Sequence, residues 1–275
     1  MGIGLSYNVF RVDFGSKVGL GHLKRSLIYA ERFENVIYIS TSSEKHLLPY
    51  PLFSIKDEKE FFYHITKLKP KEIIVDNYNF SFEDEKYIKT LLPDTKLSVF
   101  DDDYREHFCD TIINHNLGVK KENYTEPDKV KIIAPLIAKE FSKVKKRRYK
   151  KKGIFISFGG SDPYGMSLKV AKYLKGEELH LYTTSQNNDL EALQKYVFLH
   201  REVTLHIDEN IALGMAQCAY GFITPSTMAY EAIFMDLPFT AIQVAKNQVL
   251  LTRYLKRKRY TILDKNLKRI LWKRN

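Results

Sequence analysis

Segments with the hydrophobic pattern of β-strands and of α-helices alternate along the whole of this 275-residue chain. In the first half, strands are expected at residues 7–13, 36–40, 72–76, 96–101 and 111–114, and helices at 23–33, 58–68, 82–92 and 136–144. In the second half, strands are expected at 153–157, 178–183, 203–207, 220–224 and 239–242, with helices between them. Alternation of strand and helix predicts parallel sheets that helices cover on both faces. The chain is therefore expected to be an α/β protein with doubly wound, Rossmann-like sheets.

A basic segment near the middle of the chain divides this alternation into two halves. Residues 143–152 hold eight basic side chains and no acidic one, between a helical pattern and a new strand. Such a segment is typical of a solvated linker. We therefore expect two domains, residues 1–145 and residues 146–275. Open α/β sheets bind ligands at the carboxyl ends of their strands, so a cleft between the two domains is the expected place for a site.

The net charge of +11 comes from two segments rather than from a face spread over the fold. The linker is one of them, and residues 253–274, with ten basic side chains and one acidic side chain (Asp264), are the other. The remainder of the chain has 26 basic and 32 acidic residues, a balance of −6. We expect both segments to be solvated surface and expect no nucleic-acid partner. A weak contact of the basic tail with an anionic membrane face is the alternative for that segment.

Composition narrows the class of protein further. No apolar run approaches the length of a membrane span, so we expect no membrane insertion, and we expect no secretory leader. Cys109 and Cys218 lie far apart, each in an apolar context, which indicates reduced, buried thiols in a cytoplasmic protein. We expect that protein to be a monomer.

A glycine turn joins the first strand to the first helix. Arg11 and Asp13 lie at the end of the strand, and Gly19 and Gly21 precede His22 in the first turn of the helix. Helix starts offer unpaired N–H groups and the positive end of the helix dipole, which suit an anion and disfavour a cationic imidazole. A neutral histidine beside an anion is a candidate general base. The alternative is an ordinary tight turn without chemistry.

Polar side chains follow several of the other expected strands. They are Asp76-Asn77-Tyr78, Asp101-Asp102-Asp103, Asn114-His115-Asn116, the turn Gly159-Gly160-Ser161-Asp162, and Ser226 with Glu231. The glycine-rich turn and the serine at a helix start suit a phosphate, and a carboxylate suits the hydroxyls of a ribose. For each residue taken alone, helix capping or turn formation is the alternative. No metal site is expected, because adjacent carboxylates do not all point one way and no histidine pair with ligand spacing accompanies them.

These motifs occur in the order typical of one enzyme family. They are Arg11-x-Asp13, Gly19-x-Gly21-His22-x-x-Arg25, Asp76-Asn77-Tyr78, Asp101-Asp102, Asn114-x-Asn116, Gly159-Gly160-Ser161-Asp162, Ser226-x4-Glu231 and Asn247-Gln248. The chain thus resembles the UDP-2,4-diacetamido-2,4,6-trideoxy-β-L-altropyranose hydrolases of pseudaminic acid biosynthesis, a route associated with flagellin glycosylation. The resemblance covers nearly the whole chain. That family in turn resembles the two-domain GT-B glycosyltransferases.

The resemblance implies a reaction in which water attacks the anomeric carbon, UDP leaves and the free sugar is released with inversion. His22 matches the histidine that activates water, and Tyr78 matches a helper in the sugar pocket. The first domain would act on the sugar and the second would bind UDP, without a metal or other cofactor. The substrate-binding residues implied are Arg11, Asp13, Gly21, Arg25, Asp76, Asn114, Gly160, Ser161, Ser226, Thr227, Glu231, Asn247 and Gln248. His115 departs from the family pattern, in which a small apolar residue is common.

Two other functions stay open at this point. One is a GT-B glycosyltransferase that transfers a UDP-amino sugar to a membrane-associated acceptor, which the basic tail would favour. The other is a nucleic-acid-binding protein that uses the basic linker, which would bind with a steep salt dependence and leaves the glycine turns unexplained.

Overall fold

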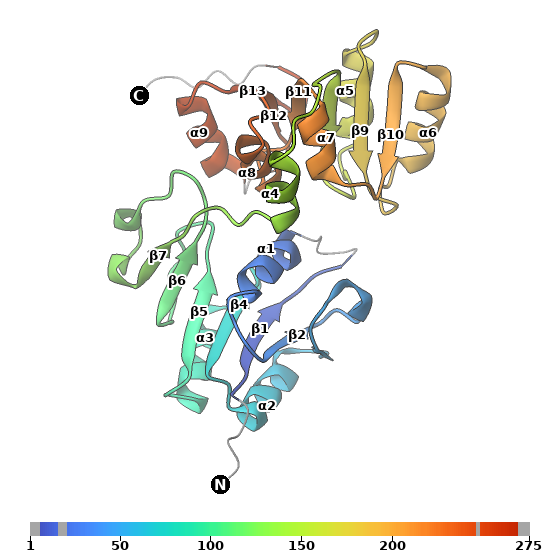
Figure 1. Cartoon of the computed structure of the whole chain (residues 1–275). Helices are drawn as coiled ribbons and strands as arrows, with labels where there is room; N and C mark the ends of the chain where they lie inside the picture. Colours follow the sequence, from blue (N-terminus) through green and yellow to red (C-terminus); the bar gives the residue numbers. More distant parts are fainter. Residues whose placement is uncertain (1–5, 16–20, 246–247, 269–275) are drawn as a thin grey trace. The chain divides into compact units, whose positions relative to one another are not determined.

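Two parallel β-sheets, one in each of two compact units, form the framework of this chain (Figure 1). The structure, a computed structural model, describes residues 6–15, 21–245 and 248–268. The first unit comprises Met1–Leu136 and the second Ile137–Asn275. Both sheets alternate with helices along the chain, so the α/β class and the doubly wound arrangement predicted from the sequence are confirmed.

The first unit holds a seven-stranded sheet with the order β3-β2-β1-β4-β5-β6-β7, in which every pair of neighbours is parallel. Its strands are β1 (Asn8–Val12), β2 (Val36–Ser40), β3 (Leu52–Ser54), β4 (Glu72–Asp76), β5 (Lys96–Phe100), β6 (Thr111–Asn114) and β7 (Val130–Ile132). The chain runs outward from β1 to β3, then returns to place β4 on the other side of β1. The carboxyl ends of β1 and β4 therefore flank the point where the strand order reverses, the usual ligand position in such sheets.

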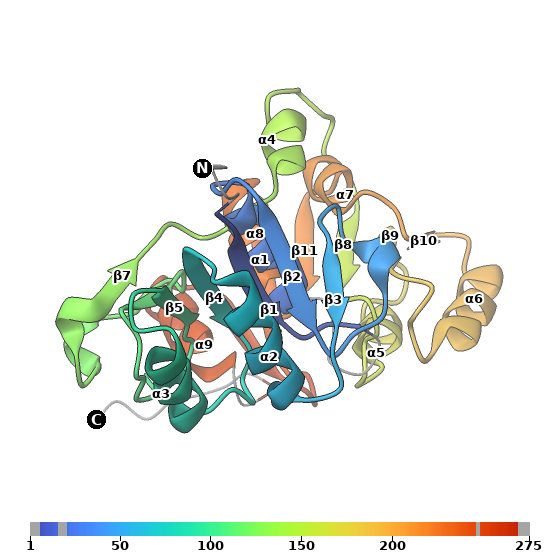
Figure 2. The ribbon, with the colours of Figure 1, turned by 90° about the horizontal axis from the view of Figure 1, so that it is seen from below.

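Helices cover both faces of this sheet because successive strand residues point to opposite faces. On one face, Phe10 and Val12 of β1 pack in a core with residues of α1 (Gly21–Ala30). On the other face, Val9 packs in a second core with residues of α2 (Glu58–Leu68) and α3 (Phe82–Leu91). Figures 1 and 2 show α2 and α3 on the same side of the sheet. Short 3₁₀ helices occur at Lys45–Leu47, Lys121–Asn123 and Pro127–Lys129.

The second unit holds a six-stranded parallel sheet with the order β10-β9-β8-β11-β12-β13. The strands are β8 (Ile154–Ser157), β9 (Leu179–Thr183), β10 (Val203–Ile207), β11 (Tyr220–Ile223), β12 (Phe239–Gln243) and β13 (Thr261–Asp264). The helices are α4 (Lys139–Lys145), α5 (Met166–Tyr173), α6 (Leu190–Leu199), α7 (Ile211–Gln217), α8 (Thr227–Phe234) and α9 (Val249–Arg257). Here the strand order reverses between β8 and β11.

The expected strands are found within one or two residues of their predicted bounds. Ser81 and Asp84 form a capping box at the start of α3. Three strands were not predicted: β3, β7 and β13. All three lie at sheet edges, where one side lacks a neighbouring strand. These three strands have three or four residues and are partly exposed, so they lack the continuous apolar run that marks a buried parallel strand; the fourth edge strand, β10, has five residues and was predicted.

The units divide at residues 136 and 137, whereas the sequence placed the boundary between 145 and 146. The difference is α4, which packs against α7 of the second unit. Lys145, in the last turn of α4, forms an ion pair of 2.7 Å with Asp236 of the same unit. Over the described ranges, the structure contains no helix with both the length and the apolar character needed to span a membrane.

Candidate active site

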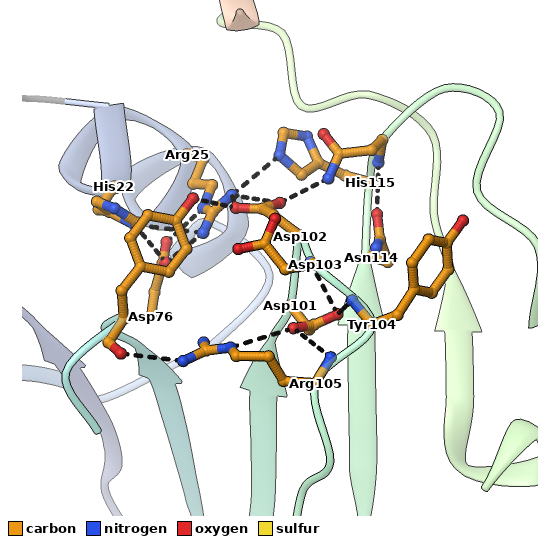
Figure 3. Close-up of polar contacts among 12 residues, drawn as sticks. His22, Arg25, Asp76, Asp101, Asp102, Asp103, Tyr104, Arg105, Asn114 and His115 are labelled. Carbon is orange, nitrogen blue, oxygen red and sulfur yellow. Dashed lines mark hydrogen bonds and ion pairs between the residues drawn. The ribbon is translucent and has the colours of Figure 1, made fainter. Parts of the chain in front are cut away.

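A buried carboxylate at the end of β4 joins two side chains from the first turns of α1. Nδ1 of His22 lies 2.6 Å from Oδ1 of Asp76, and Nε of Arg25 donates to Oδ2 of Asp76 at 2.6 Å (Figure 3). The two helix residues reach one partner because positions three apart lie on the same helix face. β1 leads into α1 and pairs with β4, so the fold brings this helix to the end of β4.

Asp76 fixes the tautomer of His22. Burial opposes the carboxylate charge, but Arg25 and the hydrogen bonds outweigh it and hold the pKa of Asp76 below its usual range. An ionised carboxylate only accepts hydrogen bonds, so Nδ1–H of His22 is the donor. In the neutral imidazole, Nε2 is then left with the lone pair. This carboxylate acts on His22 in addition to the dipole of α1, which is the only influence on His22 that was expected from the sequence.

Arg25 also holds a second carboxylate, from the turn after β5. Its Nη1 donates to both oxygens of Asp102, at 2.7 and 3.0 Å. Tyr78 donates its hydroxyl proton to Oδ2 of Asp102 at 2.6 Å, and Nδ2 of Asn116 donates to Oδ1 at 2.6 Å. Burial opposes the charge of Asp102, but Arg25 and Tyr78 outweigh it and hold its pKa far below the usual range. Burial and this neighbouring charge raise the pKa of Tyr78, which stays a phenol.

The two aromatic side chains that these carboxylates hold lie against each other. The ring centroids of His22 and Tyr78 are 4.5 Å apart, with the ring planes at 82°. One guanidinium, that of Arg25, therefore connects two pairs, His22–Asp76 and Tyr78–Asp102. With one cation and two carboxylates the cluster has an excess negative charge. That charge suits a sugar carbon that becomes positive as its bond to a leaving group loosens, and it does not suit a diphosphate.

The three adjacent aspartates after β5 do not converge. Asp101 accepts from the backbone N–H groups of Asp103 and Tyr104 at 3.2 and 2.8 Å, and from the hydroxyl of Tyr124 at 2.7 Å. It therefore organises the turn, while Asp102 faces Arg25 (Figure 3). Within the described part of the chain, no three His, Cys, Asp or Glu side chains are grouped so that they could hold a metal ion.

His115, the departure from the family pattern, lies beside this cluster. Its Nε2 is 3.4 Å from Nη1 of Arg25. Burial and the charge of Arg25 lower the pKa of His115 to about 4. At neutral pH the imidazole is uncharged, so Nε2 can accept from Arg25 and adds no positive charge.

Three of the residues expected to bind substrate form hydrogen bonds and ion pairs within the first unit. Arg11 is 1% exposed and pairs with Asp13 at 2.5 Å and with Glu58. Asp13 also accepts from the backbone N–H of Thr41 at 2.9 Å. Asn114 donates to the hydroxyl of Tyr124 at 2.8 Å and accepts from a backbone N–H. Buried polar groups need such partners, and these side chains hold the ends of the strands together.

In the second unit, a turn of small residues follows β8. A Cβ added at Gly160 would lie 2.9 Å from Oγ1 of Thr184, so only glycine fits without displacement. Asp162 ends the turn and accepts from the backbone N–H groups of Met166 and Ser167 at 2.9 and 2.7 Å, in the first turn of α5. Ser161, between them, is half-buried. The turn is thus held rigidly at the carboxyl end of a central strand.

Other expected phosphate and ribose residues follow the neighbouring strands. Ser226 and Thr227 begin α8, directly after β11, and in the described structure the Ser226 side chain does not cap its own helix. The ordinary cap that was the alternative for Ser226 is therefore not formed. Glu231 lies further along α8 and is half-buried. β8 and β11 are neighbours, so both groups lie at the strand-order reversal of this sheet.

Gln248 links the ends of two strands rather than leaving its amide free. Its Oε1 accepts from the backbone N–H groups of Val244 and Ala245 at 2.9 and 3.2 Å, and its Nε2 donates to Thr224 at 2.7 Å. Asn247, also expected at the site, lies outside the described residues, as does Gly19 of the glycine turn. Gly21 is the first residue of α1, and a Cβ added there would have no atom of the described residues within 4 Å.

Known proteins resemble this chain in sequence and in structure. No protein-family model matches it. The UDP-2,4-diacetamido-2,4,6-trideoxy-β-L-altropyranose hydrolase of Campylobacter jejuni is 34% identical over 92% of this chain and 97% of its own length. An uncharacterised protein of Methanocaldococcus jannaschii is 25% identical over 84% of this chain and 54% of its own length.

Solved structures with similar folds are glycosyltransferases at low sequence identity. MurG of Acinetobacter baumannii matches with a TM-score of 0.65 at 12% identity, over 94% of this chain and 86% of its own. HepE of Anabaena, solved with UDP and glucose, matches with a TM-score of 0.58 at 11% identity, over 92% and 89%. These likenesses establish the GT-B fold. The sequence match extends over nearly the whole of both chains, and this chain therefore belongs to the family of UDP-2,4-diacetamido-2,4,6-trideoxy-β-L-altropyranose hydrolases.

Proposed function

We propose that this protein hydrolyses UDP-2,4-diacetamido-2,4,6-trideoxy-β-L-altropyranose to UDP and the free sugar, in pseudaminic acid biosynthesis. Water attacks the anomeric carbon with inversion. The contact of 2.6 Å between Nδ1 of His22 and Asp76 carries this proposal, because it leaves Nε2 able to take a proton from water. The name of the Campylobacter jejuni relative supports the substrate.

The chain's residues divide between the two ends of the substrate. In the first unit, His22 is the general base, Tyr78 helps to hold the water, and Arg25 and Asp76 keep both side chains in position. In the second unit, Gly160, Ser161, Ser226 and Thr227 hold the diphosphate and Glu231 holds the ribose. Backbone N–H groups and hydroxyls at helix starts suit the negative charge that grows on UDP as it leaves.

Attack at carbon rather than at phosphorus follows from the charges. The cluster around Arg25 has an excess of carboxylate, which stabilises a sugar carbon that becomes positive and repels a phosphate. The bond from C1 to the UDP oxygen breaks with its electron pair on UDP. The water oxygen bonds to C1, and His22 takes one of its protons.

Isotope labelling tests this proposal. The reaction is run in oxygen-18 water, and both products are weighed by mass spectrometry. We expect the label in the free sugar. Label in UDP would show attack at phosphorus and would overturn the mechanism, while no release of UDP from this nucleotide sugar would overturn the substrate.

A glycosyltransferase function is the second candidate, because the structural relatives with this fold include glycosyltransferases. It predicts that UDP release needs an acceptor alcohol. We expect UDP release from the purified protein at the full rate without acceptor. A rate that rises strongly on addition of a lipid or sugar acceptor, with a glycoside as product, would favour the transferase.

A further inference from the structure

The hydrogen bond between Tyr78 and Asp102 sets which way the tyrosine hydroxyl points. Its length is 2.6 Å, and the carboxylate also accepts from Arg25 and Asn116. An ionised carboxylate has no proton to donate, so Tyr78 must give its single hydroxyl proton to Asp102. The lone pairs of the tyrosine oxygen are then what it presents to any other group.

We propose that Asp102 is a positioning residue that makes Tyr78 a hydrogen-bond acceptor for the water that His22 activates. The inference rests on the proposed hydrolysis. Asp102 does not act on the water itself, because Arg25, Tyr78 and Asn116 already occupy both of its oxygens. Asp102 affects the reaction only by setting the direction of the O–H bond of Tyr78.

Two acceptors side by side hold a water by both of its protons. The rings of His22 and Tyr78 are in contact, with centroids 4.5 Å apart. In the proposed arrangement, one water donates to Nε2 of His22 and to the oxygen of Tyr78. Its lone pair is then free to face the anomeric carbon. As the new C–O bond forms, one proton moves to His22 and the other remains on the hydroxyl of the released sugar. Tyr78 keeps its own proton throughout.

Contacts with Arg105 hold the Tyr78 side chain in place, so the direction of its O–H bond decides what its oxygen offers to the water. Arg105 donates to the backbone carbonyl of Tyr78 at 2.9 Å, and its guanidinium lies 5.6 Å from the centre of the tyrosine ring. Burial and Asp102 raise the pKa of Tyr78, so the side chain is not itself a base near neutral pH. If the carboxylate became an amide, its NH₂ group could donate to the tyrosine oxygen. The O–H of Tyr78 would then turn toward the water and donate to its lone pair. That lone pair would no longer be free to attack the anomeric carbon.

The test compares Asp102→Asn, Tyr78→Phe and the double variant in steady-state UDP release. We expect Asp102→Asn to lower kcat about 10²-fold, with little change in KM, because the water is misaligned while substrate still binds. The double variant should lie within roughly twofold of Asp102→Asn, because Asp102 acts through Tyr78. Losses that multiply in the double variant would overturn the inference.

Asp103→Asn is the matched control, since it removes a neighbouring carboxylate that makes none of these contacts and should keep kcat unchanged. Asp102→Glu, which keeps the charge, should recover much of the activity that Asp102→Asn loses. If Asp102→Asn does not fold, Asp102→Glu decides. In Asp102→Glu, Tyr78 should still be a hydrogen-bond acceptor, so adding Tyr78→Phe should lower kcat. If adding Tyr78→Phe leaves kcat unchanged, the inference is overturned.

A readout without substrate separates this inference from the proposed function. Tyrosine labelled with carbon-13 at Cζ reports the ionisation of each phenol by NMR, and Tyr78→Phe assigns the signal. We expect Tyr78 to lose its proton at a lower pH in Asp102→Asn than in the unaltered protein, because the neighbouring negative charge is gone. An unchanged titration would overturn the inference even if hydrolysis is confirmed. Failure of the wild-type protein to hydrolyse the nucleotide sugar would overturn the proposed function and leave this titration to decide whether Asp102 controls Tyr78.

Discussion

Asp76 is bound to His22 through Nδ1, at 2.6 Å, and so decides which imidazole nitrogen is available for chemistry. The carboxylate is 1% exposed and Arg25 neutralises its charge, so it keeps one orientation. The same carboxylate could bind a ligand only by releasing both partners. Asp76 therefore holds the His22 side chain in one orientation, and in the proposed mechanism it acts by orienting the base.

Changing Asp76 to asparagine should give the histidine the wrong tautomer. The amide NH₂ can donate to Nδ1, which places the imidazole proton on Nε2 and removes the acceptor for water. We expect Asp76→Asn to lower kcat by on the order of 10³- to 10⁴-fold, as in other carboxylate–histidine pairs. UDP binding, measured by calorimetry, should stay unchanged, because the residues proposed to hold UDP lie in the second unit. A variant that keeps most of its turnover would remove this pair from the mechanism.

His22→Asn should abolish nearly all turnover while the fold and UDP affinity remain. Asparagine has no group that accepts a proton near neutral pH, but it can still bond to Asp76 and fill part of the space. Single-turnover assays with excess enzyme distinguish slow chemistry from slow product release. Substantial activity in this variant would mean that another group activates the water.

The central part of the fold could be predicted because parallel strands buried on both faces carry continuous apolar runs. Three of the four edge strands, β3, β7 and β13, could not, because they are short and partly exposed. The glycine turn before α1 singled out His22, and the position after β4 singled out Tyr78; the structure places their rings in contact. The sequence does not distinguish the roles of adjacent residues in one turn. Asp101 accepts hydrogen bonds from backbone N–H groups, while its neighbour Asp102 accepts from Arg25.

Polar residues that bind a ligand and polar residues that hold strands together look alike in a sequence. Arg11 and Asn114 are predicted to bind substrate, and in the structure both are buried and have partners within the first unit. Their partners, Glu58 and Tyr124, come from distant segments of the chain. A contact of this kind depends on the tertiary structure and leaves no local pattern.

Gly160→Ala tests the proposed diphosphate turn. The added Cβ would approach Oγ1 and Cγ2 of Thr184 at 2.9 and 3.0 Å, so the turn or the threonine must move. We expect weaker UDP binding by calorimetry. Thr184→Ala in the same chain removes both clashing atoms and should recover much of the affinity. Unchanged UDP affinity in Gly160→Ala would place the diphosphate elsewhere.

Removal of divalent metal should leave the rate nearly unchanged. Asp101 and Asp102 are held by different partners, and the proposed diphosphate ligands are N–H groups and hydroxyls rather than carboxylates. UDP release is measured with and without a chelator, and an enzyme that requires Mg²⁺ serves as the control in the same buffer. A rate that falls with chelator and returns with a divalent cation would indicate a metal mechanism.

The stability of the first unit should depend on the charge of His107. Its Nδ1 lies 2.8 Å from Glu85 and its Nε2 lies 3.3 Å from Asp101. Burial opposes the cation, but the two carboxylates outweigh it and raise the pKa of His107 to about 9. The folded protein thus binds this proton more tightly than the unfolded chain, whose histidine has a pKa of about 6.5.

A group with a raised pKa stabilises the fold below its unfolded pKa and loses that effect as the pH rises through its folded pKa. We therefore expect His107 to contribute fully at pH 6, and its contribution to fall by about 3 kcal/mol by pH 10. Denaturant unfolding of the protein and of His107→Gln over this range measures the difference. Subtracting the variant removes the effect of other titrating groups. A difference that stays constant from pH 6 to pH 10 would mean that His107 is neutral between its two carboxylates.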